Sequence, residues 1–297
     1  MFSLYKYLNI SFLFLIICSN YSFGQNVNYK IIKLEGNVSS AKAFSIDKEG
    51  NLFILDSENN KLSKLNSDGQ FANEVGGWGW GNLNFDKPVS VEASDGLNVY
   101  VSDYFNHRIL RFNKQLEYIS TLFTRDNDDS NSKFGLPTAI AVDQFSNLFL
   151  YDNENKRILK FDKYGNIDRK FGGFESSSAK ITNPIKIEIN LENQLFVLEN
   201  DKLSKYDNWG TNTGIIRFDS TYDLINFCVD EKNIYIIHDQ NMLTSFDYYG
   251  HQLDSYDLSE MFSISDFDAV TDIKAHLENI YLLTRNTVIR LAKINYE

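Results

Sequence analysis

The sequence predicts an all-β fold, a six-bladed β-propeller, on three observations. One short phrase recurs six times along the 297 residues. Each copy is flanked by further short apolar segments and by turns, so that one unit is typical of four strands. No segment shows the apolar period of a helix over a useful length. Four-stranded units repeated around an axis build a propeller, whereas the repeats of a solenoid, the main alternative, are usually shorter.

The recurring phrase is the predicted second strand of each unit. It consists of a polar residue, an aliphatic, an aromatic and an aliphatic residue, one variable position and a final polar residue. Successive copies begin 39–49 residues apart, which is the usual length of a propeller blade. The copies are NLFILD (51–56), NVYVSD (98–103), NLFLYD (147–152), QLFVLE (194–199), NIYIIH (233–238) and NIYLLT (279–284).

The third unit illustrates the four strands, which we expect at 139–143, 147–152, 157–161 and 167–171. The turn before its fourth strand ends in Gly165, which can adopt the positive φ that closes such a turn. All three prolines of the chain precede a predicted first strand, where the missing N–H costs no hydrogen bond. They are Pro88, Pro137 and Pro184.

The two ends of the repeat region predict how the ring closes. The sixth unit has three strands before Glu297, so it lacks a fourth. The segment 29–35, YKIIKLE, is strand-like and belongs to no unit. We expect it to supply the outer strand of the last blade, because this pairing removes open sheet edges.

The first 24 residues are typical of a signal peptide rather than of the fold. Lys6 precedes an apolar run, and Ser22 and Gly24 are the small residues that signal peptidase requires. The predicted mature chain is therefore a single propeller, 25–297, exported to the periplasm or the extracellular space. The apolar run is too short for a transmembrane segment. A lipid anchor at Cys18 is not favoured, because Ile17 stands where a small residue is needed.

The composition excludes several classes of protein. Forty acidic residues against 29 lysines and arginines give a formal charge of −11, which argues against nucleic acid as a partner. Cleavage of the signal peptide leaves Cys228 as the only thiol, in an apolar run that predicts a buried, inert side chain. No nucleophile elbow, phosphate-binding loop or zinc-protease motif occurs in the sequence.

Segments 90–114 and 137–165 resemble NHL repeats of the exported bacterial type. The family's turn, Asp-x-x-Asn-x-Arg-Ile, stands at 103–109 and 152–158, with a looser copy at 56–62. The resemblance implies a six-bladed propeller. We expect the aspartate to accept backbone N–H groups across the turn and an arginine on the next strand to pair with it. These structural residues are Asp56, Lys61, Asp103, Arg108, Asp152 and Arg157, and Glu199, His238 and Thr284 replace the aspartate in the later units.

The resemblance also implies that function lies at the end of the channel formed by the blade-to-blade connections and the second-to-third-strand turns. The connection 76–88 carries Trp78, Trp80 and Phe85 among glycines. Exposed tryptophans there could anchor a sugar, a peptide or a partner surface; the alternative is a plug that packs on the neighbouring blade. The adjacent turn adds Tyr104, Phe105 and His107 as candidate binding residues.

Two groups of residues are candidates for a metal, although no cofactor is the favoured expectation. Asp126, Asp128 and Asp129 could bind Ca²⁺, but the loop lacks the glycine and glutamate positions of an EF-hand. His107 and His238 both fall in second-to-third-strand turns and could bind Zn²⁺, but no HxH or HExxH spacing occurs.

Two functions therefore stay open. The first is a non-catalytic binding or scaffold module for a protein, peptide or glycan, which the missing catalytic motifs and the aromatic loops favour. The second is a metal-dependent lyase or hydrolase with its site at the channel mouth, which rests on the turn histidines and on the fold's precedent.

Overall fold

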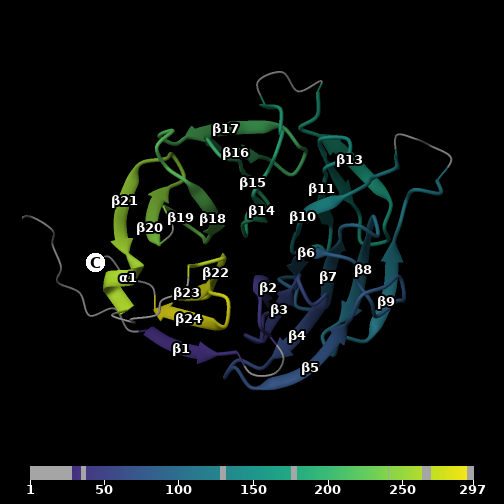
Figure 1. Ribbon diagram of the computed structural model, residues 1–297. Coiled ribbons are helices and arrows are strands. Elements are labelled where there is room, and N and C mark those ends of the chain that lie inside the picture. The colour runs from purple at the N-terminus through teal and green to yellow at the C-terminus, as the bar shows by residue number, and fades with distance from the viewer. Residues whose placement is uncertain are drawn as a thin grey trace, which may run out of the picture.

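The protein is described by a computed structural model that covers residues 29–34, 38–127, 132–174, 179–239, 241–262 and 269–292. The predicted signal peptide, residues 1–24, lies outside these ranges. Six four-stranded antiparallel sheets surround a central axis, with the first strand of each sheet innermost (Figure 1). The prediction of an all-β, six-bladed propeller is therefore confirmed.

The strands follow the predicted units closely. Blade 1 contains β2 (Ala41–Ile46), β3 (Leu52–Asp56), β4 (Lys61–Leu65) and β5 (Phe71–Gly76). Blade 2 contains β6 (Pro88–Glu92), β7 (Asn98–Asp103), β8 (Arg108–Asn113) and β9 (Tyr118–Leu122). Blade 3 contains β10 (Pro137–Val142), β11 (Leu148–Asp152), β12 (Arg157–Phe161) and β13 (Ile167–Phe171). Blade 4 contains β14 (Lys186–Ile189), β15 (Leu195–Leu198), β16 (Lys202–Tyr206) and β17 (Asn212–Arg217). Blade 5 contains β18 (Leu224–Val229), β19 (Asn233–His238), β20 (Met242–Asp247) and β21 (Gln252–Asp257).

Blade 6 is built from both ends of the chain. It contains β22 (Asp272–His276), β23 (Asn279–Leu283), β24 (Thr287–Ala292) and, as its outer strand, β1 (Tyr29–Lys33). β1 pairs antiparallel with β24 from Tyr29 opposite Leu291 to Lys33 opposite Thr287. Figure 1 shows the two strands side by side, β1 in purple and β24 in yellow. The predicted closure by the N-terminal strand is confirmed, and it removes an open edge from the last sheet.

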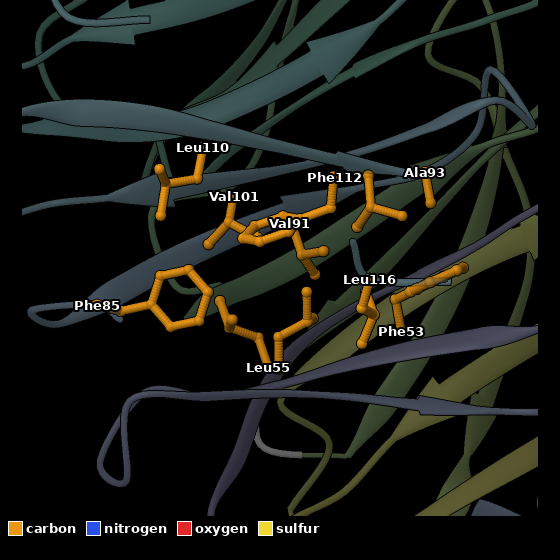
Figure 2. Close-up of a cluster of buried hydrophobic side chains, with 11 residues drawn as sticks. Phe53, Leu55, Phe85, Val91, Ala93, Val101, Leu110, Phe112 and Leu116 are labelled. Atoms are coloured by element: carbon orange, nitrogen blue, oxygen red, sulfur yellow. The ribbon is translucent and has the colours of Figure 1, made fainter. Parts of the chain in front are cut away.

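The hydrophobic core is divided among the contacts between blades. Six buried clusters each combine side chains of two neighbouring blades, so every blade packs on the next around the whole ring. The cluster between blades 1 and 2 contains Phe53 and Leu55 from β3 with Val91 and Phe112 from blade 2 (Figure 2). A single blade could not bury this surface alone, which is why the fold needs a closed ring.

Antiparallel strands give the ring two different ends. The connection face carries the blade-to-blade connections and the second-to-third-strand turns. The turn face, opposite to it, carries the first-to-second and third-to-fourth-strand turns. The one helix of the described residues, α1 (Leu258–Phe262), is a single turn in the connection between blades 5 and 6. No helix in the described ranges has the length and apolar character needed to cross a bilayer.

Candidate functional site

A carboxylate at the end of the second strand fastens the connection that enters its blade. Asp103 Oδ1 accepts the N–H of Asp86 at 2.7 Å. Asp152 Oδ1 accepts the N–H of Gly135 at 3.1 Å in the same way. Asp56 Oδ2 accepts two N–H groups from the connection before blade 1, at 3.1 and 3.2 Å. The repeated aspartate therefore has a structural role in each of these blades.

The basic residue of the turn behaves differently from blade to blade. Arg108 Nε lies 2.8 Å from Asp103 Oδ2, and Arg157 Nε lies 3.1 Å from Asp152 Oδ2. Lys61, which stands at the arginine position in blade 1, pairs differently: its ammonium lies 2.5 Å from Glu74 on the adjacent β5. In blade 1 the lysine therefore pairs along its own sheet and not across the turn.

In blades 4 and 5 other carboxylates accept the N–H group of the incoming connection in place of the repeated aspartate. Glu199 Oε1 accepts the N–H of Thr182 at 2.8 Å, and Glu199 Oε2 lies 3.0 Å from the Lys202 ammonium. In blade 5 the neighbouring Asp239, rather than His238, accepts the N–H of Asp223 at 2.9 Å.

Arg108 also fixes the aromatic loop, residues 76–87. Its Nη1 donates to the carbonyl of Trp80 at 2.7 Å, and its Nη2 donates to the carbonyls of Gly81 and Asn84, each at 3.0 Å. Asn106 Nδ2 donates to the carbonyl of Gly79 at 2.9 Å. The side chain of Arg108 is only 3% exposed, so a buried guanidinium that donates three hydrogen bonds to loop carbonyls fixes the loop on blade 2.

Two tryptophans project from this fixed loop into solvent. Trp78 is 76% exposed and Trp80 is 56% exposed. The Trp80 ring lies over the Arg108 guanidinium at 4.8 Å and meets the ring of Phe123 edge-on at 5.8 Å. Trp80 therefore keeps one face against the protein and presents the other.

The adjacent turn adds two more rings to the same surface. Phe105 is half exposed, and its N–H donates to the carbonyl of Asp86 at 3.1 Å, which joins the turn to the aromatic loop. The Lys87 ammonium lies 5.2 Å from the centre of the Phe105 ring and 5.9 Å from that of Tyr104. We name Trp78, Trp80, Tyr104 and Phe105 the aromatic platform. It lies on the connection face.

Phe85 belongs to the interior and not to this surface. Its side chain is fully buried in the cluster between blades 1 and 2, where its ring meets that of Phe112 edge-on at 6.1 Å (Figure 2). Its prediction as a partner-binding residue is wrong, since no partner can reach it. Both interpretations of the loop therefore apply to different residues. Phe85 packs between the blades as a plug, and Trp78 and Trp80 are exposed to solvent.

The ring of His107 is hydrogen-bonded through Nδ1. Its Nδ1 accepts the N–H of Leu136 at 3.1 Å and lies 3.3 Å from an Arg125 nitrogen. Partial burial and the Arg125 charge lower the pKa of His107. Nδ1 is therefore occupied as an acceptor.

His238 has partners on both ring nitrogens. Nδ1 lies 2.9 Å from Asp239 Oδ2, Nε2 lies 2.8 Å from Thr244 Oγ1, and the ring stacks on Tyr222 at 4.4 Å. His107 stands in blade 2 and His238 in blade 5, which are opposite blades of a six-membered ring. The structure does not bring these two candidate ligands together.

The acidic loop is described only in part. Asp126 is exposed, and Asp128 and Asp129 lie outside the described residues. Within the described ranges, no three or more histidine, cysteine, aspartate or glutamate side chains gather where they could hold a metal ion. Ca²⁺ or Zn²⁺ binding thus has no assembled ligand set in this part of the chain. Cys228, the predicted inert thiol, is buried, and burial raises its pKa.

A cavity of about 700 Å³ lies in the channel at the turn face, the end that sequence reasoning did not favour. Charged side chains of the first strands form its floor. The Lys274 ammonium lies 3.0 Å from Glu92 Oε2 and 3.0 Å from Glu188 Oε1. The Lys186 ammonium lies 2.9 Å from Glu188 Oε1 and 2.7 Å from Asp272 Oδ1. These five residues, the channel network, belong to blades 2, 4 and 6.

Opposite charges in the channel network offset the effect of burial on Lys274 and Glu92. Burial alone would lower the pKa of Lys274, but Glu188, Glu92 and Asp272 raise it. Burial alone would raise the pKa of Glu92, but the Lys274 charge and hydrogen bond lower it. The sequence contains a signal for this network that was missed, namely acidic and basic residues on the innermost strands β6, β14 and β22.

Comparison with solved structures supports the fold. Selenomethionine-substituted virginiamycin B lyase from Staphylococcus aureus has a TM-score of 0.62 at 13% identity, over 91% of this chain and 100% of that chain. A streptogramin B lyase has a TM-score of 0.61 at 12% identity, over 90% and 97%. A catalytically inactive histidine-to-alanine variant of the S. aureus enzyme with quinupristin has a TM-score of 0.60 at 15% identity, over 91% and 100%.

At these identities the likeness shows the propeller fold alone. No protein-family model matches the chain, and no curated protein matches its sequence. The resemblance to NHL repeats therefore stays a prediction from the sequence.

Proposed function

We propose that this protein is an exported, non-catalytic binding module that holds a protein, peptide or glycan on the aromatic platform. One observation carries the proposal: two largely exposed tryptophans stand on a loop that a buried arginine fixes in place. Export rests on the signal-like segment 1–24, which the sequence alone supports.

The fixed loop favours binding for an energetic reason. A mobile loop loses conformational entropy when a partner immobilises it, whereas a loop already held by Arg108 and Asn106 does not. Trp78 and Trp80 then offer a large apolar area with few rotatable bonds. Such rigid aromatic side chains are the residues that most often dominate binding energy in interfaces.

The alternative, a metal-dependent lyase or hydrolase, has weaker support in the described residues. Its candidate ligands, His107 and His238, stand in opposite blades and already have hydrogen-bond partners. The fold likeness to streptogramin lyases does not carry their activity to this chain.

A glycan array and a random peptide display library, both probed with the mature chain, test the proposal. We expect a ligand whose affinity falls at least tenfold in Trp78→Ala and Trp80→Ala. Trp209→Ala is the matched control, because Trp209 is 65% exposed on the turn face and its ring covers Arg169 at 4.4 Å, much as Trp80 covers Arg108. Ligands that bind both platform variants as tightly as the parent would refute this site.

A further inference from the structure

The mouth of the turn-face cavity carries exposed apolar side chains. Leu191 and Leu277 line the cavity and are 68% and 73% exposed. Leu253 lines it as well and is 45% exposed. Equivalent turns of blades 2 and 3 present Leu97 and Phe145, which are 67% and 61% exposed. Scattered exposed leucines need no explanation, but leucines gathered around a cavity indicate a binding surface.

The backbone at Leu277 makes this arrangement more informative. The turn between β22 and β23 has only two residues, and its first residue, Leu277, has a left-handed backbone with φ of 51°. The longer first-to-second-strand turns of blades 1 to 4 place Gly50, Gly96, Ser146 and Asn193 in a left-handed conformation, with φ between 60° and 82°. A leucine is disfavoured in this conformation, which glycine adopts freely.

The side chain of Leu277 is exposed, so no burial of apolar surface offsets the cost of its left-handed backbone. Leu116 also has a positive φ, of 61°, but its side chain is buried in the core between blades 1 and 2. Leu277 belongs to no buried cluster of the described residues. Backbone strain without a packing gain is a feature of functional positions, and we therefore look for a ligand of this side chain.

The charge of the same turns indicates the ligand's sign. The six first-to-second-strand turns, 47–51, 93–97, 143–147, 190–194, 230–232 and 277–278, contain eight acidic residues and two lysines. Asp47, Asp95 and Asp143 are buried and accept hydrogen bonds from their own turns. Asp230, Glu231 and Glu278 line the cavity together with Lys48 and Lys232, so the turn residues at the mouth carry a net negative charge. Below them, Lys274 is already paired with Glu92 and Glu188, so the floor offers no free cation. An anionic surface such as nucleic acid or an acidic membrane is repelled here, and a cation is attracted.

We propose that the turn-face cavity binds a basic peptide segment that also carries apolar side chains. A lysine or arginine of the peptide lies among the carboxylates of the mouth, and its apolar neighbours contact Leu191 and Leu277. A volume of about 700 Å³ suits a ligand of a few residues. This site lies on the face opposite to the aromatic platform and shares no residue with it, so either proposal can fail alone.

Three fluorescent hexapeptides test the inference by anisotropy on the mature chain. They alternate lysine with leucine, glutamate with leucine, and lysine with serine. We expect saturable one-to-one binding of the lysine–leucine peptide, at least tenfold tighter than that of the other two, because both charge and apolar area are required. Its affinity should fall as salt is added.

Leu277→Gly separates a binding role from a structural one. We expect it to raise the thermal midpoint, because glycine suits the left-handed turn, and to weaken the lysine–leucine peptide about tenfold. Leu191→Ser should weaken it similarly. Leu83→Ser, at a leucine 48% exposed on the connection face, is the control and should bind as the parent does.

Hydrogen exchange locates the bound peptide. The inference requires slower exchange at 190–194 and 277–278, and not at 76–87. Equal affinity for all three peptides, undiminished binding by Leu277→Gly and Leu191→Ser, or protection confined to 76–87 would each overturn it.

Discussion

Arg108 Nε lies 2.8 Å from Asp103 Oδ2, and the other nitrogens of the same guanidinium hold the carbonyls of the loop that carries Trp80. One buried side chain thus serves both the fold and the surface. Asp103 accepts a hydrogen bond from the connection that enters blade 2. Arg108, which pairs with Asp103, donates hydrogen bonds to the carbonyls of the aromatic loop. The fold and the candidate binding surface are therefore expected to fail together when this pair is broken.

Arg108→Ala should lower the free energy of unfolding by about 3–5 kcal/mol at pH 7, because it leaves a buried carboxylate and three carbonyls without their donor. Burial raises the pKa of Asp103 even with Arg108 beside it. In the variant this pKa rises further, so the ionised carboxylate becomes the costly form and stability falls as the pH rises above the ordinary pKa of 3.8, for example from pH 4 to pH 7. Denaturant unfolding at both pH values measures the effect.

Arg157→Ala is the matched comparison for that prediction. Arg157 pairs with Asp152 in the next blade but donates to one loop carbonyl, that of Lys133, and its side chain is 15% exposed. Its loss should cost less than that of Arg108. Equal costs would contradict the view that the aromatic loop depends on Arg108 for its order.

The fold was predictable because the sequence repeats one strand phrase at a blade-length period. The phrase's aromatic residues, such as Phe53 and Phe149, are buried at contacts between blades. The outer strand of blade 6 was also predictable, since Tyr29–Lys33 matched no unit of its own. Repeats carry such information because each unit obeys the same local rules.

The site was less predictable, because side-chain direction within an irregular loop depends on tertiary contacts. Trp78 and Phe85 form an isolated bridge, yet one points outward and the other into the core. Their spacing in the sequence contains no sign of this difference. Glu92 and Lys274 are far apart in the sequence and meet only because the ring brings blades 2 and 6 to one axis.

Lys274→Met should destabilise the ring by about 3–5 kcal/mol at pH 7, because Glu92 and Glu188 lose their shared cation while buried. The pKa of Glu92 lies below its ordinary value of 4.5. Its contribution to stability is therefore present above about pH 4.5 and is lost as the pH falls through the lowered pKa.

The pH dependence distinguishes the channel network from a general loss of packing. In Lys274→Met the two carboxyls should protonate more readily, so the difference from the parent should shrink between pH 7 and pH 4.5. Lys114→Met removes a surface pair with Glu49 and should leave the unfolding midpoint unchanged at all pH values. A pH-independent loss in Lys274→Met would show that the charges do not matter.

His238→Ala tests the enzyme alternative directly. We expect the mature chain to purify without stoichiometric zinc, and the variant to lose stability because Thr244 and Asp239 lose a hydrogen-bond partner. Metal content by mass spectrometry, and the thermal midpoint with zinc, calcium and chelator, measure both. Stoichiometric zinc that disappears in both His107→Ala and His238→Ala would restore the metal-dependent lyase or hydrolase as the better proposal.

Adjacent residues of β1 test how the ring is closed. Ile32 is buried between blades 6 and 1, whereas Ile31, its neighbour on the same strand, is 38% exposed on the other side. Ile32→Asp should lower the free energy of unfolding by about 3 kcal/mol or more, because it places a charge in an apolar cluster. Ile31→Asp should change it by no more than about 0.5 kcal/mol.

Both substitutions introduce the same side chain on adjacent residues of β1, the strand that pairs with β24, so they differ only in the face that receives the charge. If β1 closes the ring, Ile32→Asp should release it, expose the edge of β24 and increase self-association in size-exclusion chromatography. Denaturant unfolding and chromatography of the two proteins side by side give the answer. Equal stability and equal elution would mean that the sixth blade is stable without its N-terminal strand.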